Sequence, residues 1–100
     1  MAVEVKICGL TRPEDAAAAA EAGAAYLGVV FAGGPRVVTP ARAAEIASAG
    51  QGVPVFGVFA TQTEAEILST ASQAGLSGAQ LHGPYGSETA AHLRAAVSEP

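Results

Sequence analysis

Four short strand-like runs alternate along the chain with alanine-rich segments of helical character. The runs cover residues 3–7, 26–31, 53–59 and 78–81. Alternation of this kind predicts an α/β fold in which consecutive βα units contribute the strands of a parallel sheet. Because no low-complexity linker separates the units, we expect residues 1–100 to form a single domain of four βα units.

Three threonines and a serine indicate where the helices begin. The Ser/Thr-x-x-Glu spacing of a capping box occurs at Thr11–Glu14 and at Thr61–Glu64. Thr39 precedes a proline, which favours an N-cap before a proline in the first helical position. A fourth helix is expected to open at Ser87. Glycines are predicted to end the first three helices, at Gly23, Gly50 and Gly75.

Composition excludes several classes of function. The formal net charge is −4 and the five basic residues are scattered singly, so no basic stripe for nucleic acid is present. One cysteine forms no internal disulfide, and with two histidines no metal site follows from ligand spacing. The chain has no apolar stretch of membrane-spanning length, and its first residues lack the features of a secretory signal. We therefore expect a soluble cytoplasmic protein.

Polar residues share one face of two predicted strands. Period-two alternation places Glu4, Lys6 and Cys8 on the same face of the first run, and Gln80 and His82 on one face of the fourth. In a doubly wound sheet, helices would bury both faces, and these polar groups with them, at considerable cost. In a closed barrel the same face lines the interior and the mouth, where polar residues serve a ligand. The pattern favours a barrel.

Five segments, in the same order along the chain, resemble phosphoribosylanthranilate isomerase. They are residues 5–15, with the K-I-C-G-L-T motif, 23–31, 35–36, 58–59 and 80–83, with the Q-L-H-G motif. The resemblance implies an isomerase of tryptophan biosynthesis built as a parallel (βα)8 TIM barrel. It also implies an Amadori rearrangement of N-(5-phosphoribosyl)anthranilate, a small phosphorylated substrate, without a cofactor.

The resemblance further implies roles for five residues. Cys8 would be the general base, and Arg36, His82, Gln80 and Lys6 would bind substrate. A thiol serves as a base only as thiolate, which the nearby Lys6 charge favours. Arg36 suits the carboxylate or phosphate of such a substrate.

Two departures from the family pattern qualify this picture. The family's members have roughly 200 residues, as a full barrel requires, whereas this chain resembles only the first four βα units. The family's general acid, an aspartate after the fifth strand, and its phosphate-binding loops lie beyond that half, so we expect this half alone to be inactive. Gly34 also stands where the family usually has a serine before the proline.

Other interpretations of the same residues stay open. Cys8 alone also fits a small buried hydrophobe, His82 a loop cap, and Arg36 a solvated surface charge. For the whole chain, one alternative is a non-catalytic half-barrel that pairs with a second copy or with a complementing C-terminal half. The other is a flavodoxin-like module, disfavoured because no glycine-rich phosphate motif follows the first run.

Overall fold

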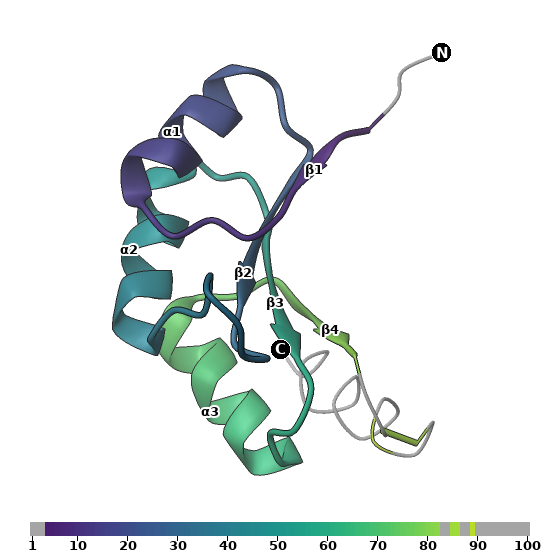
Figure 1. Cartoon of the computed structure of the whole chain (residues 1–100). Coiled ribbons are helices and arrows are strands. Elements are labelled where there is room, and N and C mark those ends of the chain that lie inside the picture. The colour runs from purple at the N-terminus through teal and green to yellow at the C-terminus, as the bar shows by residue number, and fades with distance from the viewer. Residues whose placement is uncertain (1–3, 83–84, 87–88, 90–100) are drawn as a thin grey trace.

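Strands and helices alternate strictly in the computed structural model, which describes residues 4–82, 85, 86 and 89. All strands are parallel, in the order β1-β2-β3-β4 (Figure 1). The helix that we expected to open at Ser87 lies outside the described residues. The elements are β1 (Lys6–Ile7), α1 (Pro13–Glu21), β2 (Tyr26–Val30), α2 (Pro40–Ala49), β3 (Val55–Phe59), α3 (Glu64–Ala74) and β4 (Gly78–Leu81).

The described helices all lie on one side of the sheet. Figure 1 shows α1, α2 and α3 side by side on the left, with the strands to their right. A flavodoxin-like sheet reverses its strand order at a switch point and carries helices on both faces. Neither feature occurs in residues 4–82, where the order is sequential. The barrel prediction is therefore confirmed over these units, and the flavodoxin-like alternative is wrong for them.

The hydrophobic core lies between the sheet and these helices. In β3, Val55, Gly57 and Phe59 are buried, whereas Phe56 and Val58 are only half-buried. The two sets alternate because successive side chains of a strand point to opposite faces. On the helix side, small alanines and two isoleucines complete the core, so the helices approach the sheet closely. These residues are Ala16, Ala43, Ile46, Ile67 and Ala74.

Two helices begin directly before a proline. Thr39 is the N-cap of α2, as predicted, and its hydroxyl accepts a hydrogen bond from the Arg42 N–H at 3.1 Å. The N-cap of α1 is Arg12 and not Thr11, so that prediction was wrong. The physical reason is Pro13 at the first helical position, which keeps the preceding residue extended, with φ −132° and ψ 139° at Arg12.

The capping box of α3 also lies two residues beyond its predicted place. The Thr63 hydroxyl accepts from the Glu66 N–H at 3.2 Å, and the Glu66 carboxylate accepts from the Thr63 N–H at 2.7 Å. Thr61 and Glu64 have the same sequence spacing, but Thr61 is not the cap. The predicted helix ends are close to the observed ones, which are the C-caps Ala22, Gly50 and Gly75.

Within the described residues, no helix is both long and apolar enough to cross a membrane. The cytoplasmic location stays a prediction.

The two threonines provide a test of the start of α3. Thr63→Ala removes the hydroxyl of the capping box and is expected to lower the free energy of unfolding by about 1 kcal/mol. Thr61→Ala is the matched control and should change it much less. Urea unfolding followed by far-UV circular dichroism measures both variants. Equal losses for the two would contradict the assignment of Thr63 as the cap.

Candidate active site

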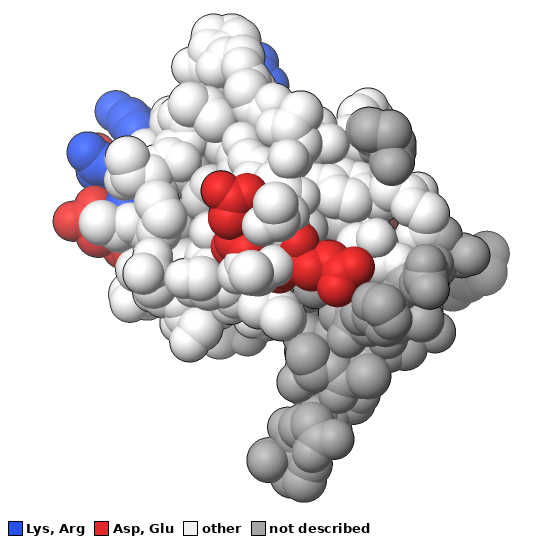
Figure 2. Space-filling model, turned by 90° about the horizontal axis from the view of Figure 1, so that it is seen from below, with Lys and Arg blue, Asp and Glu red and all other residues white. Residues whose placement is uncertain are grey.

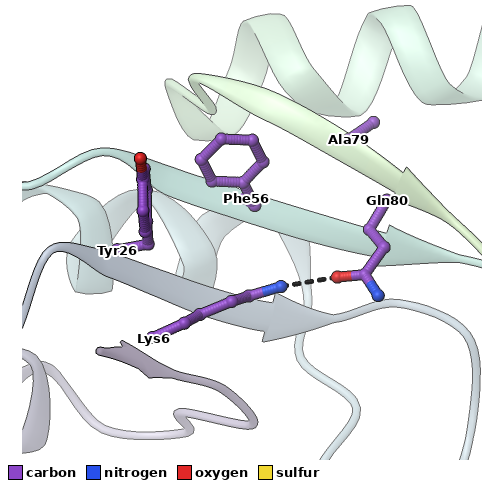
Figure 3. A pocket seen from close by; sticks show the side chains of 5 residues that line it. All are labelled: Lys6, Tyr26, Phe56, Ala79 and Gln80. Carbon is purple, nitrogen blue, oxygen red and sulfur yellow. Dashed lines mark hydrogen bonds between the residues drawn. The ribbon is translucent and has the colours of Figure 1, made fainter. Parts of the chain in front are cut away.

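A lysine and a glutamine meet on the face of the sheet that the helices leave uncovered. Lys6 lies on β1 and Gln80 on β4, at opposite edges of the sheet. The Lys6 Nζ donates a hydrogen bond to the Gln80 Oε1 at 2.5 Å, and the two side chains point toward each other across the intervening strands (Figure 3). Parity placed both residues on one face, and the structure joins them.

Two aromatic rings form an apolar wall beside this pair. The Lys6 Nζ is 6.0 Å from the centroid of the Phe56 ring, within the range of a cation–π interaction. The Tyr26 ring meets Phe56 edge-on, with centroids 5.7 Å apart, and its hydroxyl donates to Glu4 at 3.3 Å. Sequence reasoning missed Tyr26 as a site residue, although it alternates with buried Leu27 and so falls on the open face.

These side chains enclose a shallow hollow of about 300 Å³. Its lining combines aromatic rings with one cation and one amide, the mixture typical of sites for small organic ligands. Figure 3 shows the hollow with its lining residues, Lys6, Tyr26, Phe56, Ala79 and Gln80. The hollow can therefore accept a small anion that carries a ring.

The thiol of Cys8 lies just past the end of β1, against the backbone of β2. Cys8 is free and exposed, so it is not a buried hydrophobe. A Cβ atom at Gly28 would be 2.8 Å from the Cys8 Sγ and 3.3 Å from its Cα, so any side chain there would force Cys8 to shift. Gly28 is thus required for close approach, and the thiol can stand on the open face.

Gly9 turns the chain and provides a surface for an arginine. Its φ of +79° is left-handed, which favours glycine. The turn brings the Leu10 N–H to the Gly28 carbonyl at 3.1 Å and buries the Leu10 side chain. A Cβ atom at Gly9 would be 3.0 Å from Cδ and 3.1 Å from Nη1 of Arg36. The Arg36 side chain, though exposed, therefore lies over the residue next to Cys8.

His82 follows β4 and continues its ladder, because its backbone N–H donates to the Phe59 carbonyl at 2.7 Å. Its side chain is exposed, and among the described residues none is hydrogen-bonded to the imidazole. The structure thus joins Lys6 to Gln80, and it places Arg36 over Gly9, the neighbour of Cys8 in the chain. It gives His82 neither of these contacts.

Acidic side chains mark the end of the fold at which the helices begin. The first turns of α1 and α3 carry Glu14, Asp15, Glu64 and Glu66, where negative charge complements the helix dipole. Seen from below, acidic groups gather near the middle of this end of the molecule (Figure 2). The Arg12 guanidinium, hydrogen-bonded to Asp15, lowers the pKa of that carboxyl. An anionic ligand therefore depends on individual cations such as Arg36 and Lys6.

Within residues 4–82, no three metal-ligating side chains cluster.

Comparison with known proteins identifies relatives over nearly the whole chain. Residues 5–99 match the family model of N-(5'phosphoribosyl)anthranilate (PRA) isomerase. The N-(5'-phosphoribosyl)anthranilate isomerase of Paracoccus denitrificans is 41% identical over 102 residues, covering 100% of this chain and 47% of the relative. The chain thus spans about half the length of the curated relatives it matches.

Solved structures agree with this match. One is a phosphoribosyl anthranilate isomerase in complex with reduced 1-(o-carboxyphenylamino)-1-deoxyribulose 5-phosphate, with a TM-score of 0.91 and 34% identity over 96% of this chain and 50% of that one. Another shows monomers of a dimeric isomerase from Thermotoga maritima, with a TM-score of 0.88 and 38% identity over 94% of this chain and 49% of that one. The chain belongs to the N-(5'-phosphoribosyl)anthranilate isomerase family.

Proposed function

We propose that this chain supplies the base-bearing half of an active phosphoribosylanthranilate isomerase. The reaction converts N-(5-phosphoribosyl)anthranilate to 1-(2-carboxyphenylamino)-1-deoxyribulose 5-phosphate, without a cofactor. The observation that carries the proposal is the placement of an exposed thiol, Cys8, beside Gly9, over which Arg36 lies. A related isomerase was solved with a reduced form of this product, which supports the same substrate class.

The rearrangement needs one acid and one base. Protonation of the furanose ring oxygen opens the ring to an imine, and removal of the C2′ proton gives an enolamine that tautomerises to the ketone. We assign the second step to the Cys8 thiolate, which takes the C2′ proton. Because Arg36 lies over Gly9, the residue after Cys8, its guanidinium would hold the substrate's carboxylate while the thiolate reaches C2′.

The remaining predicted residues would bind substrate. Lys6 and Gln80 present an ammonium and an amide beside the hollow, and the Phe56 ring provides an apolar surface for the anthranilate ring. His82, exposed at the end of β4, would complete these contacts. Binding in such a site depends on the barrel being closed, because the hollow is shallow and open to solvent on the described half.

The acid would come from outside this half. The resemblance to phosphoribosylanthranilate isomerase implies that the general acid follows the fifth strand and that the phosphate-binding loops follow strands seven and eight. We therefore treat residues 1–100 as one N-terminal (βα)4 half of a TIM barrel and expect it to be inactive without strands five to eight.

Turnover tests the proposal directly. Freshly generated phosphoribosylanthranilate is added to the chain alone and to the chain co-expressed with a segment that supplies strands five to eight, and the loss of anthranilate-type fluorescence is followed. We expect turnover only with the second segment. Cys8→Ala should lower kcat at least about a hundredfold, because it removes the general base.

The matched control is Arg42→Met, which removes a surface cation of α2 that lies outside the proposed site. It should leave kcat and KM close to those of the parent pair. A folded pair that is inert, or one that stays fully active with Cys8→Ala, would reject the role of Cys8.

Close approach of Cys8 to Gly28 predicts a coupling between the two positions. Gly28→Ala places a methyl group 2.8 Å from the Cys8 Sγ and should destabilise the fold by about 1–3 kcal/mol. In a Cys8→Ala background the sulfur is absent, so Gly28→Ala should lower the free energy of unfolding by about 1 kcal/mol less than it does in the parent chain. Urea unfolding of the single and double variants measures this difference. Equal costs in both backgrounds would show that the sulfur is not the obstacle.

A second candidate function is self-association without catalysis. It is favoured by apolar side chains on the helix side of the sheet at its β1 edge, where Ile7 is 37% exposed and Val5, directly before β1, is 49% exposed. The half-buried Phe56 and Val58 form a second, partly apolar surface on the opposite, open face of the sheet. Exposed apolar area and an open strand edge both favour pairing with another chain.

Size in solution separates the two functions. If self-association is the function, sedimentation of the chain alone should show a discrete dimer that persists when the second segment is added. If the isomerase proposal holds, the added segment should displace self-association and give a one-to-one pair. Val5→Lys, directly before β1, should weaken either kind of pairing at this edge.

A further inference from the structure

A glutamine in the turn between β3 and α3 connects the ends of neighbouring strands. The Gln62 Nε2 donates to the Phe31 carbonyl at 2.7 Å, just past the end of β2. Its Oε1 accepts from the Ala60 N–H at 3.1 Å and from the Thr61 N–H at 3.2 Å. Its backbone carbonyl accepts from the hydroxyl of Tyr85, which follows β4, at 2.9 Å. One partly buried residue thus joins three strand ends.

Phe31 is the residue from which the loop of Arg36 departs. Its N–H donates to the Val58 carbonyl at 2.9 Å, and its ring stacks on Phe59 with centroids 5.1 Å apart. The bond from Gln62 fixes its remaining backbone group. The start of the loop over residues 32–37 is therefore held by a backbone bond, a ring stack and one side-chain amide.

Within the loop, one turn defines the path near Arg36, because the Val37 N–H donates to the Gly34 carbonyl at 3.3 Å. Gly33 and Gly34 adopt left-handed φ values of 109° and 95°. The loop returns to the sheet where the Val38 N–H donates to the Val30 carbonyl at 3.0 Å. Between these ends, Arg36 must still reach across to Gly9. Because Gly33 and Gly34 permit many paths, the position of the turn that carries Arg36 depends on how firmly the loop's ends are fixed.

We propose that Gln62 is a positioning residue, whose Nε2–H donor bond to the Phe31 carbonyl holds the loop so that Arg36 lies over Gly9, the residue after Cys8. Gln62 acts through Arg36 and does not touch substrate. The inference rests on the proposed function, since it makes Gln62 a determinant of how the substrate's carboxylate is bound.

The two ends of the amide have separable tasks. The acceptor oxygen shapes only the turn at Ala60 and Thr61, whereas the donor nitrogen alone reaches the Phe31 carbonyl. Gln62→Glu keeps the acceptor and loses the donor, and Gln62→Leu loses both at similar size. Gln73→Leu is the matched control, because Gln73 is an exposed residue of α3 near the opposite end of that helix.

The experiment uses the chain paired with the segment that supplies strands five to eight. The rate of hydrogen exchange at the amides of residues 31–38 measures how firmly the loop is held. Steady-state kinetics measure KM and kcat for the substrate. We expect both Gln62 variants to speed exchange in this segment and to raise KM about tenfold, with kcat changed less than about threefold. The Gln73 variant should alter neither quantity. If Gln62 only shapes the turn, the variants should give less folded enzyme without a rise in KM, and the proposal would be wrong.

Parent-like exchange and KM in Gln62→Glu would overturn the proposal, as would faster exchange with an unchanged KM. If Gln62→Leu fails to fold, Gln62→Glu alone decides. If the parent pair is folded but inert, the isomerase proposal fails, whereas the exchange data still decide whether Gln62 fixes the loop.

Discussion

The described structure depends on burying one face of a sequentially ordered parallel sheet under its helices. Each crossover returns on the same side, so α1, α2 and α3 cover a single face (Figure 1). Apolar residues such as Leu27 and Phe59 supply the burial, and both are fully inaccessible. The other face is left without helices, and this is why polar residues such as Lys6 and Gln80 can stand there without the cost of burial.

Sequence alone predicted the order of elements better than the starts of the helices. The rule that placed Thr39 before a proline would also have placed Arg12 before Pro13, because a proline fixes the first helical position in both. The capping-box pattern misled at Thr61 because the spacing occurs twice in residues 61–66. Which copy acts depends on the turn, where the Gln62 side chain already accepts hydrogen bonds from Ala60 and Thr61.

Parity predicted which site residues share a face, but not which of them touch. The pairing of Lys6 with Gln80 spans 74 positions of sequence and depends on the curvature of the sheet between them. The position of Arg36 over Gly9 depends on the path of a glycine-containing loop, which no periodicity describes. Local patterns report the direction of a side chain, whereas contacts between distant segments are set by backbone geometry.

That geometry depends on two glycines, which have no side chain. Gly28 leaves room for the Cys8 thiol against β2, and Gly9 leaves room for the Arg36 side chain that lies over Gly9. A methyl group at Gly28 would displace Cys8, and a methyl group at Gly9 would displace Arg36. The proposed base and the proposed carboxylate-binding cation are therefore placed by the backbone itself. Gly9 and Gly28 have no reactive groups, but the candidate site depends on them as much as on Cys8 and Arg36.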